Sequence, residues 1–224
     1  MKIDVTSIKP QKRGEIMKTL KMFGILGMVA ALGLGFAMRL TAAEVVAKST
    51  LDNLQAAYNG ESNAKARYDA FAAKADAEGY KSVAALFRAT SRSESIHAAK
   101  HAVAIKKLGA EPDAVIGKSD VKSTKENLEA ALKGETYEKE SMYPAFIKQA
   151  DTDKNSGAVM SFKGALAAEV EHAKLFAQAL KELDSWKEAG KEFYVCTVCG
   201  FTMSKILPKC PVCAAPKSKF DIIK

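Results

Sequence analysis

Histidine and cysteine are scarce in this chain, and their positions are informative. The 224 residues include only three histidines and four cysteines. No cysteine precedes Cys196, so any all-sulfur metal site or disulfide is confined to the end of the chain. The sequence also lacks a basic stripe interleaved with aromatic residues, and +5 of the net charge of +8 lies in the first 43 residues. We therefore expect no nucleic-acid partner.

The first 43 residues have the form of a secretory leader. Lys18 and Lys21 precede an uncharged apolar run over residues 22–38, and small residues at 41 and 43 suit cleavage before Glu44. We predict export to the periplasm. An uncleaved membrane anchor is the alternative, because the run approaches the length of a spanning helix. Met17 begins a more conventional leader than Met1, so a translation start at Met17 is a second hypothesis.

Four amphipathic segments follow, at about residues 50–78, 81–108, 123–150 and 156–189. Each carries a stripe of inward-facing residues at spacings of three and four, which is typical of a helix packed in a bundle. Pro144 is expected to kink the third segment. The loop over residues 110–122 is long enough to cross one end of a bundle. The sequence therefore predicts a mainly α fold: a four-helix bundle over residues 44–190 and a small domain over residues 191–224.

Acidic residues interrupt all four stripes. Two segments contain Glu-x-x-His, as Glu94 with His97 and as Glu169 with His172, and residues three apart share one helix face. A solvated face could explain any one of these glutamates, but several unpaired carboxylates in one core would cost too much free energy without cations. One Glu from each of two helices, with Glu-x-x-His from the other two, is the ligand pattern of ferritin-like two-metal sites.

This pattern predicts a role for each ligand. The carboxylates and imidazoles suit iron or manganese, and carboxylates bridge two metals readily. The expected bridges are Glu94 and Glu169, the terminal ligands are Glu61 and Glu135, the nitrogen ligands are His97 and His172, and Glu138 is surplus. Two irons can exchange two electrons together, which suits reduction of a peroxide O–O bond.

Three further side chains lie close to these ligands in the sequence. Tyr68 follows Glu61 by seven residues, on the same helix face, and Tyr143 follows Glu138 by five. Tyr68 and Tyr143 either pack in the core with a locally satisfied hydroxyl or donate a hydrogen bond to a ligand carboxylate. His101, one turn beyond His97, is interpreted as a buried core histidine. A hydrogen bond to a ligand and direct metal binding are its alternatives.

The last thirty or so residues contain two Cys-x-x-Cys knuckles close together. This pattern indicates a tetrahedral sulfur site that accepts iron or zinc, with disulfides as the alternative. The ligands would be Cys196, Cys199, Cys210 and Cys213.

Together these features resemble rubrerythrin over residues 50–224. The matching strings are Gly60-Glu61-Ser62 with Tyr68, Glu94-x-x-His97, Gly134-Glu135-x-x-Glu138 with Met142-Tyr143-Pro144, and Glu169-x-x-His172. The surplus Glu138 distinguishes this pattern from plain ferritins and bacterioferritins.

The resemblance implies a ferritin-like diiron bundle with a C-terminal rubredoxin-like domain, and reduction of hydrogen peroxide to water in oxidative-stress protection. The implied cofactors are two carboxylate- and oxo-bridged irons and one tetrathiolate iron. Electrons would pass through the tetrathiolate centre, often across a head-to-tail homodimer. The implied catalytic residues are Glu138 and His97, which exchange as ligands of one iron, together with Tyr68 and Tyr143.

Two other functions are compatible with the same ligands. A ferroxidase or iron-storage protein would use the diiron site without an electron supply, and a metal-stabilised structural or redox-sensing bundle would have no enzymatic activity. Export would exclude NAD(P)H as the electron donor and favour a periplasmic carrier such as a c-type cytochrome. Because the chain has no twin-arginine motif, we expect it to be exported unfolded and loaded with iron afterwards.

Overall fold

A computed structural model describes residues 49–188 and 190–224, which belong to one compact unit. The predicted leader lies outside the described residues. Within the described part, no helix is long and apolar enough to cross a membrane.

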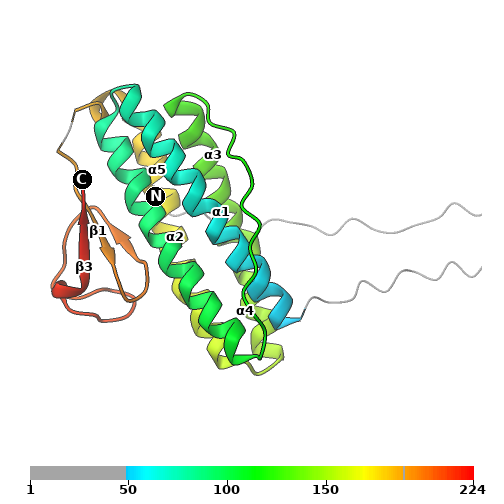
Figure 1. Ribbon diagram of the computed structural model, residues 1–224. Coiled ribbons are helices and arrows are strands. Elements are labelled where there is room, and N and C mark those ends of the chain that lie inside the picture. The colour runs from blue at the N-terminus through cyan, green and yellow to red at the C-terminus, as the bar shows by residue number, and fades with distance from the viewer. Residues whose placement is uncertain (1–48, 189) are drawn as a thin grey trace, which may run out of the picture. The chain divides into compact units, whose positions relative to one another are not determined.

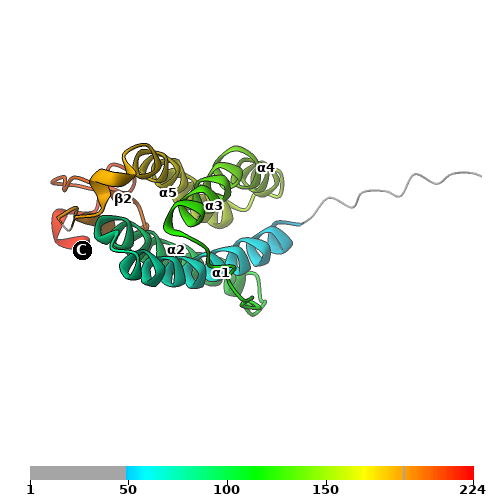
Figure 2. The ribbon, with the colours of Figure 1, turned by 90° about the horizontal axis from the view of Figure 1, so that it is seen from above.

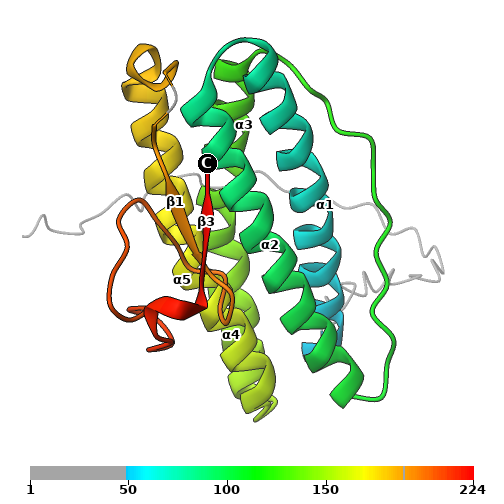
Figure 3. The ribbon, with the colours of Figure 1, turned by 60° about the vertical axis from the view of Figure 1, so that its left-hand side comes forward.

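A bundle of long helices forms the main body (Figure 1). Its helices run side by side, with α1 along α2 and with α3 and α4 along α5 (Figures 1 and 3). Capping boxes at Ser49 and Ser123 begin α1 and α3, where each serine accepts a hydrogen bond from the third helical N–H. The helices are α1 (Thr50–Ala77), α2 (Lys81–Lys107), α3 (Thr124–Tyr137), α4 (Tyr143–Thr152) and α5 (Ser156–Lys181).

The third helical segment contains a π-helix between α3 and α4, at Glu138–Met142. Pro144 is the second residue after it, in the first turn of α4, and lacks the N–H that an α-helix would use there. The inserted residue shifts the inward face by one position, so Tyr143 is buried whereas Ala145 is exposed. An unbroken α-helical period predicts Met142 and Ala145 on the inward face. Met142 is only partly buried, packed against an apolar cluster, and Ala145 is exposed, so this prediction fails beyond Glu138.

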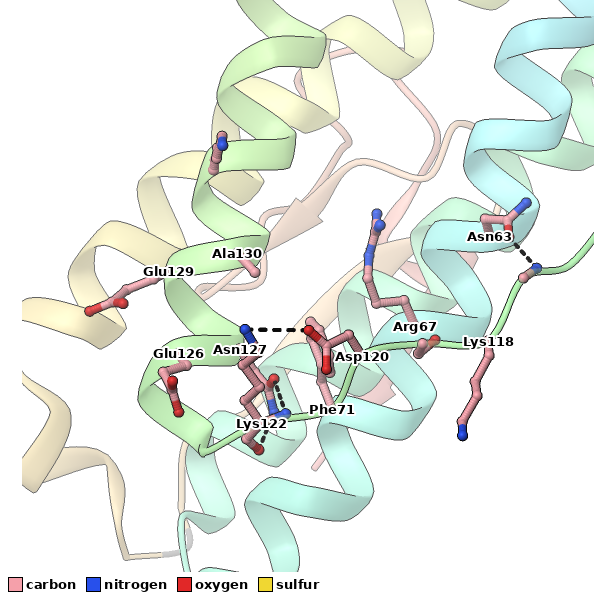
Figure 4. Close-up of a pocket in the computed structure, with 13 residues that line it drawn as sticks. Asn63, Arg67, Phe71, Lys118, Asp120, Lys122, Glu126, Asn127, Glu129 and Ala130 are labelled. Atoms are coloured by element: carbon pink, nitrogen blue, oxygen red, sulfur yellow. Dashed lines mark hydrogen bonds and ion pairs between the residues drawn. The ribbon is translucent and has the colours of Figure 1, made fainter.

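The crossover loop between α2 and α3 is extended and is held by three amide side chains on α1. These side chains are four residues apart along α1. Each accepts a hydrogen bond from one loop N–H, and the three donor residues are two apart along the loop. The spacings match, because four helical residues rise roughly 6 Å and two extended residues roughly 6.6 Å. The pairs are Gln55 with Asp113 at 3.1 Å, Asn59 with Val115 at 2.9 Å and Asn63 with Gly117 at 2.9 Å. Figure 4 shows Asn63 facing this loop at the rim of a surface cavity of about 530 Å³.

Two apolar clusters lie on either side of the buried carboxylates. One is built around Tyr68, Phe87 and Phe176, whose ring centroids are 5.4–5.9 Å apart. The other includes Ile105 and Phe162. These clusters hold the helices together, so the polar middle layer does not have to stabilise the bundle by itself.

The C-terminal domain is a small antiparallel sheet with strand order β2-β1-β3. Its strands are β1 (Phe193–Cys196), β2 (Thr202–Met203) and β3 (Phe220–Ile223). β1 and β3 pack against α2, and β2 packs against α5 (Figure 3). Arg92 forms an ion pair with Asp221 at 2.8 Å across this contact.

The connection to this domain differs from the prediction. The last long helix was expected to reach residue 189, but α5 ends at Lys181 and a 3₁₀ turn follows at Leu183–Trp186. Trp186 is buried in the bundle's apolar cluster and stacks on Phe193, with ring centroids 6.1 Å apart. Trp186 thus packs against Phe193 of β1 where the chain passes from α5 to the C-terminal domain, a stretch that Figure 2 shows beyond the end of α5.

Candidate metal centres

The two Glu-x-x-His motifs meet in the middle of the bundle, one on α2 and one on α5. Each glutamate directs one carboxylate oxygen toward each histidine. Glu94 lies 2.9 Å from Nδ1 of His97 and 3.3 Å from Nδ1 of His172. Glu169 lies 3.2 Å from Nδ1 of His97 and 2.7 Å from Nδ1 of His172. Two carboxylates that each span both histidines have the geometry of bridging ligands.

Each histidine side of the site has one further carboxylate. Glu61, on α1, joins the side of His97, and Glu135, at the end of α3, joins the side of His172. The potential ligand atoms in each group lie within 4.8 Å of one another. The structure therefore brings together all six residues expected to be bridging, terminal and nitrogen ligands.

Both tyrosines donate hydrogen bonds to the terminal carboxylates. Tyr68 donates to Oε1 of Glu135, and Tyr143 donates to Oε1 of Glu61. Each tyrosine thus fixes a glutamate on another helix. Burial, reinforced by the neighbouring carboxylates, raises the pKa of both phenols well above its usual value. The hydroxyls are therefore donors near neutral pH.

The donor set fits a pair of cations. Buried carboxylate oxygens without a hydrogen-bond partner include Oε2 of Glu61, Oε1 of Glu94 and both oxygens of Glu169. Such groups cost free energy unless a cation or proton neutralises them. Burial and the neighbouring carboxylates raise the pKa of Glu61 and Glu169 well above its usual value. If the cations were removed, protons bound to these carboxyls would neutralise their charge instead.

The fifth glutamate near the site, Glu138, belongs to neither ligand group. It begins the π-helix, one turn after Glu135, and is partly exposed. Burial and then Glu135, Glu169 and Glu94 raise the pKa of its carboxyl well above the usual value, while Arg67 opposes the shift. Glu138 therefore lies close enough to interact electrostatically with the site carboxylates, but it is not among the grouped ligand residues in this structure.

His101 is a buried, hydrogen-bonded histidine rather than a member of either ligand group. Its Nε2 lies 3.1 Å from the Tyr143 hydroxyl, and its Nδ1 lies 2.8 Å from Oγ of Ser161. Burial, followed by the nearby His97 and Lys100, lowers its pKa to about 3. The imidazole is therefore neutral at physiological pH, and it reaches the site through Tyr143.

The four cysteines form the second candidate centre. They are free thiols, with Sγ atoms 3.6 Å apart in Cys196 and Cys213 and 3.5 Å apart in Cys199 and Cys210. Tetrahedral coordination with metal–sulfur bonds of about 2.3 Å requires sulfur separations of roughly 3.8 Å. Backbone N–H groups of residues 198 and 199 also point at the Cys196 sulfur. This arrangement fits one tetrahedral metal ion.

The two centres approach each other at Gly200, the residue after Cys199. A Cβ atom at Gly200 would lie 2.4 Å from Nε2 of His97, so only a hydrogen atom fits there. Ser93 donates a 2.6 Å hydrogen bond to the Gly200 carbonyl. On the other side, Nε2 of His172 lies 3.1 Å from Oγ1 of Thr202. The outer nitrogens of both histidines therefore face the C-terminal domain.

The sequence did not identify Ser93, Thr202 or Ser161 as part of either site. Ser93 precedes His97 by one turn, and Ser161 lies on the face of α5 that packs against α2. Helical spacing could therefore have identified both serines as candidate site residues. No local sequence pattern could have identified Thr202, because its contact with His172 depends on how the C-terminal domain packs against the bundle.

Two family models match the chain: rubrerythrin over residues 52–180, and the rubredoxin-like domain of rubrerythrin over residues 194–221. The chain is 38% identical to nigerythrin of Nitratidesulfovibrio vulgaris over 175 residues, which covers 77% of this chain and 85% of that protein. It is 35% identical to rubrerythrin-2 of Clostridium acetobutylicum over 178 residues, which covers 77% of this chain and 95% of the relative.

Solved structures agree with this similarity. The fully reduced, all-ferrous state of nigerythrin superposes with a TM-score of 0.73 at 36% identity, covering 82% of this chain and 91% of nigerythrin. A bacterioferritin of Mycobacterium tuberculosis superposes with a TM-score of 0.56 at 24% identity, covering 61% of this chain and 86% of that one. That second likeness shows the ferritin-like fold alone. With its ferritin-like bundle and its four-cysteine domain, the chain belongs to the rubrerythrin family.

Proposed function

We propose that the protein reduces hydrogen peroxide to water at a diiron centre, using electrons delivered through the four-cysteine site. The overall reaction consumes one peroxide, two electrons and two protons and releases two waters. Iron bound by the carboxylates and histidines would supply the two electrons that O–O cleavage requires. The observation that carries the proposal is the contact of Gly200 with His97, because it joins the cysteine site to a ligand of the other site.

The residues around the carboxylate site have separate tasks in this scheme. Glu94 and Glu169 fix the spacing between the two histidines. Tyr68 and Tyr143 orient the terminal glutamates and hold protons near the site. The apolar clusters on both sides exclude water from the reaction.

The electron path proposed here runs along the backbone from Cys199 to Gly200 and then across the contact to His97. It requires iron in the cysteine site, since zinc has no accessible second oxidation state. The contact lies within one chain, so this path does not require a second copy. Assembly into a homodimer stays a prediction.

The proposed role of Glu138 is that of an alternative ligand to His97 when the oxidation state changes. Because Glu138 is outside both ligand groups, Glu138→Ala should leave iron content unchanged. We expect the peroxide reaction to slow by roughly 10–100-fold, the usual cost of losing a group that supports a metal site. The measurement is anaerobic reduction of purified protein followed by stopped-flow mixing with hydrogen peroxide.

Glu140→Ala is the matched control, because Glu140 belongs to the same π-helix and its side chain is 63% exposed. It should react at the wild-type rate. Unchanged peroxide turnover in Glu138→Ala would remove the proposed role of this residue. Faster reoxidation of the wild-type protein by oxygen than by peroxide would contradict the peroxidase proposal as a whole.

A ferroxidase or iron-storage role remains the second candidate, because the carboxylate site by itself resembles that of ferritins. The cysteine domain favours the peroxidase, since storage of iron needs no adjoining electron supply. Stoichiometric zinc in the cysteine site would support the second candidate instead.

We further propose that the protein works in the periplasm and receives electrons from a periplasmic carrier such as a c-type cytochrome. The support is the leader-like sequence of residues 1–43. Sequencing the N-terminus of the native protein should give Glu44 as its first residue. A native chain that begins near Met1 would contradict both cleavage and the start at Met17.

A further inference from the structure

Three side chains outside the two ligand groups connect the carboxylate site with the protein surface. Tyr143 on α4 contacts the ligand Glu61, His101 on α2 contacts Tyr143, and Ser161 on α5 contacts His101. The three therefore come from three different helices, and their polar atoms form an unbroken hydrogen-bonded row.

The chemistry of these groups gives the row a direction. A carboxylate that binds a cation has no proton, so the single hydroxyl proton of Tyr143 is donated to Glu61. The Tyr143 oxygen must then accept the hydrogen bond from Nε2–H of His101, at 3.1 Å. A neutral imidazole that carries its proton on Nε2 has an acceptor at Nδ1, and Ser161 donates to it at 2.8 Å. Every donor thus points toward Glu61.

Burial separates the two ends of the row. His101 and Tyr143 are 0% exposed. Ser161 is 8% exposed and lies on the wall of a surface cavity of about 640 Å³, which Lys100 and Met160 also line. The row therefore begins at a cavity that admits water and ends at a metal-ligand carboxylate.

We propose that Ser161, His101 and Tyr143 conduct protons from this cavity to Glu61 during turnover. The inference rests on the proposed peroxide reduction, which needs two protons in a site with apolar walls. Electrons would enter at His97 from the cysteine domain, and protons would enter through Ser161 on α5, His101 on α2 and Tyr143 on α4.

Each transfer moves one proton from the cavity to Glu61. Water in the cavity gives a proton to Ser161 as Ser161 passes its hydroxyl proton to Nδ1 of His101, and the hydroxide left behind leaves through the cavity to solvent. His101 gives its Nε2 proton to the Tyr143 oxygen, and Tyr143 gives its hydroxyl proton to the Glu61 carboxylate, from which it passes to the departing oxygen. His101 begins and ends as a neutral imidazole with its proton on the other nitrogen.

The alternative is that His101 only fills space and orients Tyr143. His101→Gln separates the two roles, because a glutamine amide can donate to Tyr143 and accept from Ser161 but does not exchange tautomers. Ser161→Ala removes the outer link without touching a ligand, and Ser161→Thr restores its hydroxyl. Thr90→Val is the matched control, because the buried Thr90 hydroxyl bonds only to the Leu86 carbonyl of its own helix.

The experiment uses the full-length, iron-loaded protein and three measurements. The first is stopped-flow oxidation of the reduced protein by hydrogen peroxide in H₂O and D₂O. The second is urea unfolding. The third is the oxidised-minus-reduced infrared difference spectrum of protein with ¹⁵N-labelled histidine, in which His101→Gln identifies the bands of His101.

We expect His101→Gln and Ser161→Ala to react about tenfold more slowly, below the roughly 10²–10⁴-fold that a general acid contributes outright. Their solvent isotope effects should rise, while Ser161→Thr and Thr90→Val should match the wild type. The wild-type spectrum should contain bands of an Nε2-protonated His101, and these bands should shift in Ser161→Ala.

Wild-type rates and isotope effects in both His101→Gln and Ser161→Ala would overturn the proton route. So would slow reaction of His101→Gln with a normal rate in Ser161→Ala, since that pair of results indicates orientation of Tyr143 alone. Failure of the proposed function is distinguishable, because the wild-type protein itself would then not be oxidised by peroxide. The infrared bands of His101 would still report its tautomer.

Discussion

Replacing Gly200 with alanine is expected to interrupt electron transfer between the two centres while both still bind metal. The added Cβ would lie 2.4 Å from Nε2 and 2.7 Å from Cδ2 of His97. The imidazole cannot retreat, because it is buried and its other nitrogen faces Glu94 and Glu169 at 2.9 Å and 3.2 Å. The cysteine domain must therefore move away from α2.

The expected loss is roughly 10²-fold in the rate at which peroxide oxidises the four-cysteine iron, since a displacement of about 1 Å at a reacting pair can cost that much. Stopped-flow spectroscopy can follow the iron–thiolate and diiron bands separately after mixing reduced protein with peroxide. The diiron band should respond at the wild-type rate, and the iron–thiolate band should lag. Simultaneous wild-type responses of both bands would contradict this electron path.

Backbone strain is a competing explanation for such a loss, because Gly200 has a φ of 84°. Ala214 occupies the equivalent position after Cys213 with a φ of 60°, so an alanine is compatible with this kind of knuckle. Gly79→Ala provides the matched control. Gly79 has a φ of 82° and no atom near its would-be Cβ, so the substitution should cost about 1 kcal/mol of stability and leave electron transfer unchanged.

Helical periodicity predicted the arrangement of most of the carboxylate site. Glu61, Glu94 and Glu169 occur at inward positions of stripes whose apolar members are buried, so a correct helical period was enough to bring them together. The two Glu-x-x-His motifs needed no tertiary information, because both ligands of each motif lie on one turn.

The errors arose where the backbone departs from the ideal period or where two domains meet. The π-helix after Glu138 adds one residue to the turn, so extrapolation selected Met142 where Tyr143 is buried. The partner of Tyr68 also required tertiary structure, since its hydroxyl reaches Glu135 on another helix. Docking of the cysteine domain was beyond helical reasoning because it depends on Gly200 fitting against His97.

Once its metals are removed, the protein is expected to lose free energy of unfolding as pH rises from 6.5 to 8. In the metal-free site, burial and the neighbouring carboxylates raise the pKa of Glu61 and Glu169. Burial acts to lower the pKa of His172, but three carboxylates raise it well above its usual value. In this pH window, these three groups have largely lost their protons in the unfolded chain. In the folded protein, each group whose pKa lies above the ambient pH keeps its proton.

The sign follows from proton linkage. A folded state that binds more protons than the unfolded state loses stability as pH rises, by about 1.4 kcal/mol per pH unit for each proton retained. The groups with lowered pKa act only at lower pH: Glu94, near 2, and His101, near 3, contribute no slope above pH 6.5. The metal-free protein should therefore lose stability as pH rises across the window.

Bound metal should abolish or reverse this slope, because cations keep the carboxylates ionised and metal ligands must be deprotonated. Urea unfolding of chelator-treated and iron-loaded protein at several pH values between 6.5 and 8 measures both slopes. Glu169→Gln removes one titrating group, so it should flatten the metal-free slope, whereas Glu129→Gln, at a side chain that is 55% exposed, should leave the slope unchanged. Equal slopes with and without iron would mean that the buried carboxylates are neutralised by something other than the metals, and the two-metal interpretation of this core would fail.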